Sequence, residues 1–351
     1  MSDKSSTDKP LTYESAGVDI REAERAIRGF QDAVRSTYTP QVLSDVGSFG
    51  GMFSGIFTGF ETPVLASSID GIGTKTKIAA MVGYFRGLGR DIVSHCVNDI
   101  LCVGAKPLFF LDYYASSKLS AEQVVEIVQG MAEACREVEC ALLGGELAEM
   151  PSVYCEGEFD IVGAIVGVVD KNKIYPRENI FNGDLIIGIA SDGLHTNGYS
   201  LARCALFEKK GRAVTDVIPE LGRTLGEELL RPHRCYFSSV YPILQEEGLI
   251  KAVAHITGGG FQGNIPRVLP KDARAVIERR SWTVPPIFEM IQSDGEITIE
   301  EMFKTFNMGI GMVLICASET ASAVVQRLND AGESAYVIGE ITKGLRGVNI
   351  V

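Results

Sequence analysis

The sequence has few features of membrane, secreted or nucleic-acid-binding proteins. Lysine and arginine number 33 against 45 aspartates and glutamates, which gives a formal net charge of −12. A nucleic-acid partner is disfavoured because there is no basic excess to displace counterions from a phosphate backbone. The longest apolar run, 161–169, is about half of what spans a bilayer. The first ten residues are polar and charged, which disfavours a secretory signal and predicts a disordered tail over residues 1–10.

The cysteines lack the spacing of a metal site. None of the eight belongs to a Cys-x-x-Cys pair, and most lie within apolar runs, as buried thiols do. This pattern disfavours a zinc or iron–sulfur site and indicates reduced thiols. We therefore expect a cytoplasmic protein without structural disulfides.

The chain is long enough for two hydrophobic cores, with 351 residues of which 46% are hydrophobic. Strand-like and helix-like patterns alternate on both sides of a polar stretch, 170–184, which is the best candidate for a domain boundary. We therefore predict an α/β (α+β) protein with two domains, residues 11–172 and 173–351.

The hydrophobic patterns predict individual elements in both halves. In the first half we expect strands at 62–69, 107–115, 140–143 and 159–169, helices at 89–104 and 120–137, and a loop that begins at Gly144. In the second half we expect strands at 185–190, 253–256, 311–316 and 335–340, and helices at 198–210, 234–247, 264–269 and 319–330.

The stretch that begins at Asp70 combines both signs of charge at the end of a predicted strand. Gly71 and Gly73 let the backbone come close to an anion, while Thr74 offers a hydroxyl and Lys75 a positive charge. Asp70 has the wrong charge for a phosphate but suits a magnesium ion between two phosphates. The spacing of a Walker A loop is absent. Taken alone, the stretch fits a solvated turn as well as it fits a phosphate site.

Three acidic residues lie at predicted strand or helix ends in the first half, namely Asp70, Asp99 and Glu146. Magnesium prefers hard oxygen ligands and takes carboxylates together with phosphate oxygens and water. Asp99 stands beside an apolar helical stripe, where a buried acid needs a partner. We predict that Asp70 and Asp99 bind a metal ion. Glu146 is a third candidate ligand, with an ordinary acid at a loop end as the alternative.

Further loops place glycines after a predicted strand. Gly144 and Gly145 follow one strand, and without other support a tight turn is the better explanation for them. In 192–201, His195 could transfer protons or contact a developing negative charge, although a lone loop histidine is more often simply exposed. A third loop, 257–266, again places glycines between a strand and a helix. Several such loops across two domains favour anion binding at an inter-domain cleft.

Taken together, these residues resemble the phosphoribosylformylglycinamidine cyclo-ligase family, the aminoimidazole ribonucleotide synthetases of purine synthesis. The resemblance runs in consistent order from about residue 11 to residue 345. It is carried by the stretches 13–20, 70–75, 96–100, 104–115, 144–151, 195–201, 255–261, 264–270 and 305–309.

The resemblance implies a homodimer in which the N-terminal mixed sheets join into a barrel, and a C-terminal domain with a second mixed sheet and flanking helices. It also implies ATP-dependent ring closure of formylglycinamidine ribonucleotide, with ATP and Mg2+ as cofactors and K+ as an optional addition. The implied catalytic residues are His195, Lys75 and Asp70. The implied ligands are Gly71, Gly73, Thr74, Lys75, Gly144, Gly145 and Asn197 for ATP, Gly258, Gly259, Gly260 and Asn264 for the substrate, and Asp70, Asp99 and Glu146 for the metal.

Two positions depart from the family pattern. Leu194 replaces a usual proline, which predicts a less rigid loop, and Leu147 replaces a usual threonine, which removes a hydroxyl. Two other functions stay open, namely another ATP-using enzyme of the same superfamily, such as thiamine monophosphate kinase, and a nucleotide-binding regulator without catalytic activity.

Overall fold

The computed structural model describes residues 11–351, so the disordered tail predicted for residues 1–10 lies outside the described residues. The first half of the chain forms a four-stranded sheet with the strand order β1-β4-β2-β3. β2 and β3 are parallel and the other neighbours are antiparallel, so the sheet is mixed, as predicted. Its elements are η1 (Glu14–Ala16), α1 (Ile20–Arg35), β1 (Pro63–Gly71), α2 (Lys75–Val82), α3 (Arg86–Leu101), β2 (Lys106–Ser116), α4 (Ala121–Glu137), β3 (Ala141–Glu149) and β4 (Phe159–Asp170).

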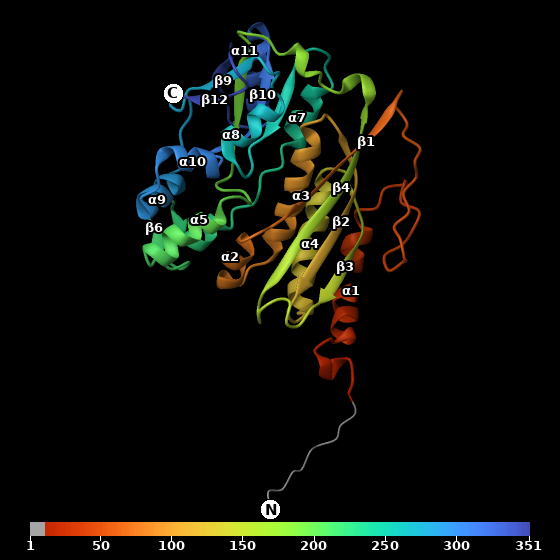
Figure 1. Ribbon diagram of the computed structural model, residues 1–351. Helices are drawn as coiled ribbons and strands as arrows, with labels where there is room; N and C mark the ends of the chain where they lie inside the picture. The colour runs from red at the N-terminus through yellow and green to blue at the C-terminus, as the bar shows by residue number, and fades with distance from the viewer. Residues whose placement is uncertain (1–10) are drawn as a thin grey trace, which may run out of the picture.

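Helices α3 and α4 cover one face of this sheet, and α1 packs against α4 (Figure 1). The residues of β1 alternate between half-buried and exposed along the whole strand. Because successive side chains of a strand point to opposite faces, Ser68 and Asp70 are on the side of the helices. The helical spacing of the apolar residues correctly predicted α3, which is buried over most of its length.

The second half of the chain forms a six-stranded mixed sheet with the order β12-β9-β11-β5-β10-β8, in which only β12 and β9 are parallel. Helix α11 packs on β11 and β5, while α7 contacts both α11 and α3. The elements are η2 (Lys171–Lys173), η3 (Arg177–Asn179), β5 (Leu185–Ala190), α5 (Tyr199–Arg203), the π-helix η4 (Cys204–Lys209), β6 (Val217–Ile218), β7 (Arg223–Thr224), α6 (Leu225–Leu229), α7 (Phe237–Leu244), β8 (Ala252–His255), α8 (Gly260–Asn264), η5 (Ile265–Arg267), β9 (Ala273–Ile277), α9 (Pro286–Gly295), α10 (Ile299–Thr305), β10 (Ile310–Cys316), α11 (Ser318–Asp330), β11 (Ala335–Lys343) and β12 (Gly347–Ile350).

The prediction of a loop that begins at Gly144 is wrong. Strand β3 continues through Gly144 and Gly145 to Glu149 and stays paired with β2 throughout. A Cβ atom on Gly145 would lie 2.3 Å from Oδ1 of Asp112 on β2, so this glycine permits a close approach between two strands and not a turn. The sequence patterns did not predict α1, α2, β6, β7, α6, β9, α9, α10 and β12.

The face of the four-stranded sheet opposite the helices is apolar and exposed. Leu65 and Ile69 of β1 are 60% and 68% exposed, and Leu111 of β2 is in register with Ile69 across Ala164 of β4. The predicted barrel would join the sheets of two copies through this face, and it stays a prediction. The domain limits 11–172 and 173–351 also stay a prediction, with one sheet on either side of residue 172.

All eight cysteines are unpaired, as their spacing indicated. Four of them, Cys96, Cys135, Cys140 and Cys316, are buried. Over residues 11–351, each helix is too short or too polar to traverse a bilayer.

Two glycines set the distance between α3 and α4. A Cβ atom on Gly89 of α3 would lie 1.9 Å from the carbonyl oxygen of Ile127 on α4. A Cβ atom on Gly130 of α4 would lie 2.0 Å from the carbonyl oxygen of Arg86 on α3. The two backbones therefore touch where the helices cross, and the position of α3 on the sheet depends on both glycines.

We predict that Gly89→Ala lowers the free energy of unfolding by about 1–3 kcal/mol, the usual cost of forcing a methyl group into a packed contact. Gly55→Ala is the control because a Cβ atom at that position has no neighbour within 4 Å. The control should change stability by less than about 0.5 kcal/mol in urea titrations. Equal stability of the two variants would contradict the close contact between α3 and α4.

Candidate functional site

Helix α3 places a stripe of polar side chains where the two halves of the chain meet, formed by Asp91, His95, Asn98 and Asp99. Residues three or four apart share one face of a helix, so the spacing aligns them. Oδ1 of Asp91 accepts a hydrogen bond of 2.7 Å from the backbone N–H of His233. Asn98 donates to the carbonyl oxygen of Arg234 at 2.8 Å and accepts from the N–H of Tyr236 at 3.0 Å. The stripe thereby holds segment 233–236 of the second half.

The same stripe faces the end of β1. Ser68 and Asp70, two residues apart on one face of the strand, lie opposite Asp99 and His95, four residues apart on the helix. Ser68 donates its hydroxyl hydrogen to Oδ2 of Asp99 at 2.9 Å. Nε2 of His95 lies 3.5 Å from Oδ2 of Asp70. The fold therefore brings together Asp70 and Asp99, the two acids predicted to bind a metal.

The two carboxyl groups have opposite pKa shifts. Burial, and then the neighbouring Asp99 carboxylate, raise the pKa of Asp70 to about 7. Burial alone would also raise the pKa of Asp99, but the hydrogen bond and charge of His255 outweigh burial and lower it. The acid pair has a stable charge of −1 on Asp99, and a second negative charge forms on Asp70 only near neutral pH. A cation at this point would favour the doubly ionised state.

A cavity of about 460 Å³ opens beside Asp99 at the junction of the two halves. Its wall includes Ser68, Asp99 and His255, and it also includes three cationic side chains, Arg177, Lys251 and Arg267. Lys251 is paired with Asp184 at 2.6 Å. The cavity wall thus combines one carboxylate, Asp99, with three cationic side chains, an arrangement suited to a phosphorylated ligand with a bound cation.

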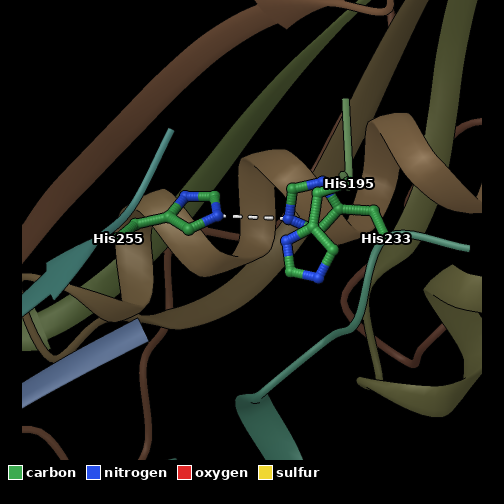
Figure 2. Close-up of side chains that lie close together, drawn as sticks. All are labelled: His195, His233 and His255. Atoms are coloured by element: carbon green, nitrogen blue, oxygen red, sulfur yellow. Dashed lines mark hydrogen bonds between the residues drawn. The ribbon is translucent and has the colours of Figure 1, made fainter. Parts of the chain in front are cut away.

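All four histidines of the chain gather next to this acid pair: His95, His195, His233 and His255. His255 directs Nδ1 to Oδ1 of Asp99 at 2.8 Å, and its Nε2 lies 3.1 Å from Nε2 of His233. The ring of His195 stacks on that of His233 with the ring centres 4.1 Å apart (Figure 2). Burial, and then the charge of His255, lower the pKa of His95 to about 3. Burial likewise places the pKa of His195 and of His233 well below the usual value.

The loop around His195 is tightly held despite the leucine at position 194. His195 itself has a left-handed backbone with φ of 62°, a conformation that costs a non-glycine residue energy. Its Nε2 accepts from the backbone N–H groups of Asp192 at 3.2 Å and Arg234 at 3.4 Å. The side chain is 2% exposed and lies outside the cavity wall, so the direct catalytic contact predicted for His195 does not fit its placement. The carboxylate of Asp192 pairs with Arg231 at 2.7 Å.

The two glycine loops of the second half touch each other. Asn197 accepts a short hydrogen bond from the N–H of Gly258. Gly259 and Gly260 both have positive φ, and helix α8 begins at Gly260, four residues before the predicted helix. Asn264 donates to the carbonyl oxygen of Gly260 at 2.8 Å, so part of its hydrogen-bonding capacity holds the loop, although the residue also lines the cavity.

The residues after Asp70 have two different environments. Gly71 ends β1, and Gly73 and Thr74 form the turn before α2, where Oγ1 of Thr74 lies 3.0 Å from Oγ of Ser200. Lys75 instead points inward and is fully buried. Its ammonium group pairs with Asp91 at 2.6 Å and donates to the carbonyl oxygen of Arg231 at 2.8 Å. The phosphate contact predicted for Lys75 does not fit this placement, because no surface of its side chain is exposed to a ligand.

Glu146 is not brought to the acid pair within one chain. It is exposed on β3, and β4 and β2 separate β3 from β1. Three strand spacings of about 4.8 Å place it some 14 Å from the end of β1. Gly144 and Gly145 belong to β3 and so lie at this far edge of the sheet as well. Their predicted contact with phosphates beside Asp70 therefore does not fit their placement within one chain.

Sequence reasoning missed several residues that build the site: Asp91, His95, His233, His255 and Arg267. His255 lies within the predicted strand 253–256, three residues before the triple glycine, which was a usable signal. Asp91 and His95 lie two turns and one turn before Asp99 on the same helix, so the helical period could also have found them. The position of His233 follows only from the bonds between segment 233–236 and α3.

Comparison with known protein families agrees with the two-part architecture. The N-terminal domain model of the AIR synthase related proteins matches residues 60–169, and the C-terminal domain model matches residues 182–351. The fold and the site therefore define a two-domain protein of the AIR synthase related class.

Curated relatives identify the family within that class. The phosphoribosylformylglycinamidine cyclo-ligase of Alkaliphilus metalliredigens is 48% identical over 96% of this chain and 97% of its own length. The one of Geobacter metallireducens is 46% identical over 98% of each chain. The chain belongs to the phosphoribosylformylglycinamidine cyclo-ligase family, a family of ligases.

Solved structures share the fold at low sequence identity. Thiamine-monophosphate kinase from Stenotrophomonas maltophilia has a TM-score of 0.69 at 14% identity, covering 92% of this chain and 95% of its own. Hydrogenase maturation protein HypE in complex with ATP has a TM-score of 0.65 at 20% identity, covering 95% and 92%. At these identities the likeness concerns the fold alone.

The buried pair of Lys75 and Asp91 gives a test of a structural role against phosphate binding. Asp91→Asn should lower the free energy of unfolding by about 3–5 kcal/mol, because it leaves a buried ammonium group without its counter-ion. Adding Lys75→Met removes that charge while the asparagine can still accept from His233, so the double variant should recover most of the loss. Urea titration measures both. If Lys75→Met alone keeps full stability and loses only ATP affinity, the structural role is contradicted.

Proposed function

We propose that this chain catalyses ATP-dependent ring closure of formylglycinamidine ribonucleotide to 5-aminoimidazole ribonucleotide, ADP and phosphate, and that it does so in the cytoplasm. The named relatives support the reaction at near full length. The structural observation that carries it is the contact of Asp70 and Asp99 beside the inter-domain cavity. This arrangement joins a site for a cation with room for a phosphorylated small molecule.

The chemistry explains why ATP is needed. The formyl amide carbon is a poor electrophile, so its oxygen first takes the γ-phosphoryl group of ATP and becomes a leaving group. The nitrogen that carries the ribosyl group then attacks that carbon, the carbon–oxygen bond breaks, and phosphate departs. Phosphoryl transfer asks the protein mainly for positioning and charge neutralisation. The half-buried carboxylates of Asp70 and Asp99 and the cations of the cavity wall suit both tasks.

The acid pair fits a magnesium ion. Asp70 and Asp99 are close enough to share a hydrogen bond, and Asp70 retains its proton up to about pH 7 because of burial and the second carboxylate. Mg2+ held by these two side chains would neutralise the phosphate charge of bound ATP. Ser68 and His255 each donate a hydrogen bond to Asp99 and so fix its orientation. Outer partners of this kind orient ligating carboxylates.

The cavity wall suggests where the substrate phosphate binds. Arg177 and Arg267 both line the cavity, and Arg267 is exposed. A guanidinium group is well shaped for bidentate contact with a phosphate. We therefore assign these two arginines to the ribonucleotide phosphate and the turn of Gly73 and Thr74 to ATP.

The purified chain should produce ADP and aminoimidazole ribonucleotide from formylglycinamidine ribonucleotide and MgATP, assayed with and without K+. Asp70→Asn should reduce turnover at least about a hundredfold, a loss of about 2.7 kcal/mol of transition-state stabilisation. Asp330→Asn, an exposed acid on α11, is the matched control and should keep wild-type turnover. No product from the wild type would sink the proposal. Formation of ADP from ATP with thiamine monophosphate as the phosphoryl acceptor instead would favour a kinase, and binding of ATP without any product would favour a regulator.

The stability of the same variant separates a catalytic loss from misfolding. Above pH 7, wild-type Asp70 is ionised beside Asp99 in the folded state, and this repulsion opposes folding. Asp70→Asn removes it and should raise the free energy of unfolding at pH 8 by the order of 1 kcal/mol, a discounted figure because the side chain is about a third exposed. At about pH 3, below the ordinary pKa of 3.8, the carboxyl group is mostly protonated both folded and unfolded, so most of the gain should vanish. Urea titrations at the two pH values measure it.

The exposed sheet face supports a homodimer. Leu65, Ile69 and Leu111 form an apolar surface on the side of the sheet that no helix of residues 11–351 covers. Exposed apolar surfaces of this kind mark protein–protein contacts. We propose that two copies pair through these faces, as a barrel of two four-stranded sheets would require.

Leu65→Glu should convert the dimer into a monomer in sedimentation experiments, because the pairing would bury an unpaired carboxylate. Leu345→Glu is the control, since Leu345 is 80% exposed and lies at the other sheet. A wild type that sediments as a monomer would rule out the pairing.

A further inference from the structure

We infer that His195, His233 and His255 form a binding site for a divalent transition-metal ion of the zinc class, separate from the carboxylate pair proposed for magnesium. One ring nitrogen of each lies within 4.8 Å of the others, and all three side chains are buried. Three imidazole ligands with a fourth position left for water are a common zinc arrangement. Soft-to-borderline imidazole donors distinguish this site from the oxygen ligands that magnesium prefers.

The hydrogen bonds of the histidine rings leave two ring nitrogens without a hydrogen atom, and these two nitrogens face each other. Nδ1 of His95 accepts from the Thr196 hydroxyl at 2.7 Å, the shorter of the two contacts that this hydroxyl makes with histidine nitrogens. That hydroxyl has one hydrogen, so Nδ1 of His233, at 3.2 Å, must donate to it. Nε2 of His233 is then left with a lone pair.

A second series of hydrogen bonds starts at Asp99. Its carboxylate accepts from Nδ1 of His255, which leaves Nε2 of His255 with a lone pair as well. The two bare Nε2 atoms of His233 and His255 are 3.1 Å apart. Two lone pairs at this distance repel unless a cation lies beside them. Two nitrogens bound to one tetrahedral zinc ion are separated by about 3.3 Å, close to the observed distance.

His195 supplies the third nitrogen. Its Nδ1 is buried without a hydrogen-bond partner, which is uncommon for a buried polar atom. Figure 2 shows its ring stacked on His233 with one nitrogen on the side that faces His255. The contacts of Nε2 with the backbone, 3.2 and 3.4 Å, are long and permit the small rotation that binding requires.

The site has the surroundings that metal centres need. The carboxylate of Asp99 orients His255, and the hydroxyl of Thr196 orients His233, as outer partners do around metal-bound imidazoles. His255 borders the cavity, which provides a path for the ion. Gly311 leaves the space that His195 occupies, because a Cβ atom there would lie 2.6 Å from Cε1 of the ring.

The chain makes a sharp test possible because its only four histidines are in this cluster. The full chain, without any histidine tag and treated with a chelator, is titrated with Zn2+ against a chromophoric competitor and with Co2+ in the visible range. We expect one tight equivalent of Zn2+ and the absorption of four-coordinate Co2+ without thiolate charge-transfer bands. His233→Gln should weaken Zn2+ binding at least about a hundredfold, since loss of an outer partner alone costs 10–100-fold.

Two controls separate the histidines from other ligands. Asp70→Asn alters the proposed magnesium site, and Cys155→Ser with Cys204→Ser removes the two exposed thiols. Both should keep the affinity for Zn2+. Wild-type affinity in His233→Gln, or loss of affinity only in the cysteine variant, would overturn the site.

A measurement on the wild type covers the case in which His233→Gln fails to fold. In ¹⁵N spectra of the imidazole rings, Zn2+ should shift the Nε2 resonances of His233 and His255 and the Nδ1 resonance of His195. Unchanged resonances, with His255 protonated on both nitrogens at neutral pH, would show that a proton supplies the positive charge and would overturn the inference. Neither result depends on ring-closing activity, so the proposed function is tested separately.

Discussion

The site depends on the polar stripe of α3 inside an otherwise apolar interface. Asp91 and Asn98 hold segment 233–236 through its backbone, and Asp99 and His95 face the end of β1. Each of these groups is costly to bury alone, so the helix, the strand and the segment must assemble together to satisfy them. The glycine contact between α3 and α4 then fixes how far the helix stands from the sheet.

The same constraint gives the acids their chemistry. The alternation of β1 and the period of α3 bring two carboxyl groups together, and burial raises the pKa of Asp70 while His255 lowers that of Asp99. Lys75 is used inside the protein to balance Asp91 and is not available to phosphates. The cavity wall contains two arginines, Arg177 and Arg267, which we proposed as the source of positive charge for a ligand.

The sequence predicted most strongly periodic elements, and it predicted the pairing of Asp70 with Asp99 because both lie at element ends that meet in this fold. It failed where tertiary contact outweighs local pattern. Gly144 and Gly145 suggested a turn, yet they lie within β3, where Asp112 needs the space. Lys75 looked like a phosphate ligand, because nothing nearby in the sequence reveals Asp91 as its partner. The histidine cluster joins residues up to 160 positions apart, from His95 to His255, so no local motif could predict it.

We propose that β1 and α3 together create a metal–nucleotide site. The most direct measurement is anomalous diffraction from crystals of the full chain grown with Mn2+ and a non-hydrolysable ATP analogue. We expect an anomalous peak bonded to the carboxylates of Asp70 and Asp99, with the analogue's phosphates on its other side. A nucleotide and Mn2+ bound elsewhere, with both carboxylates free, would contradict it.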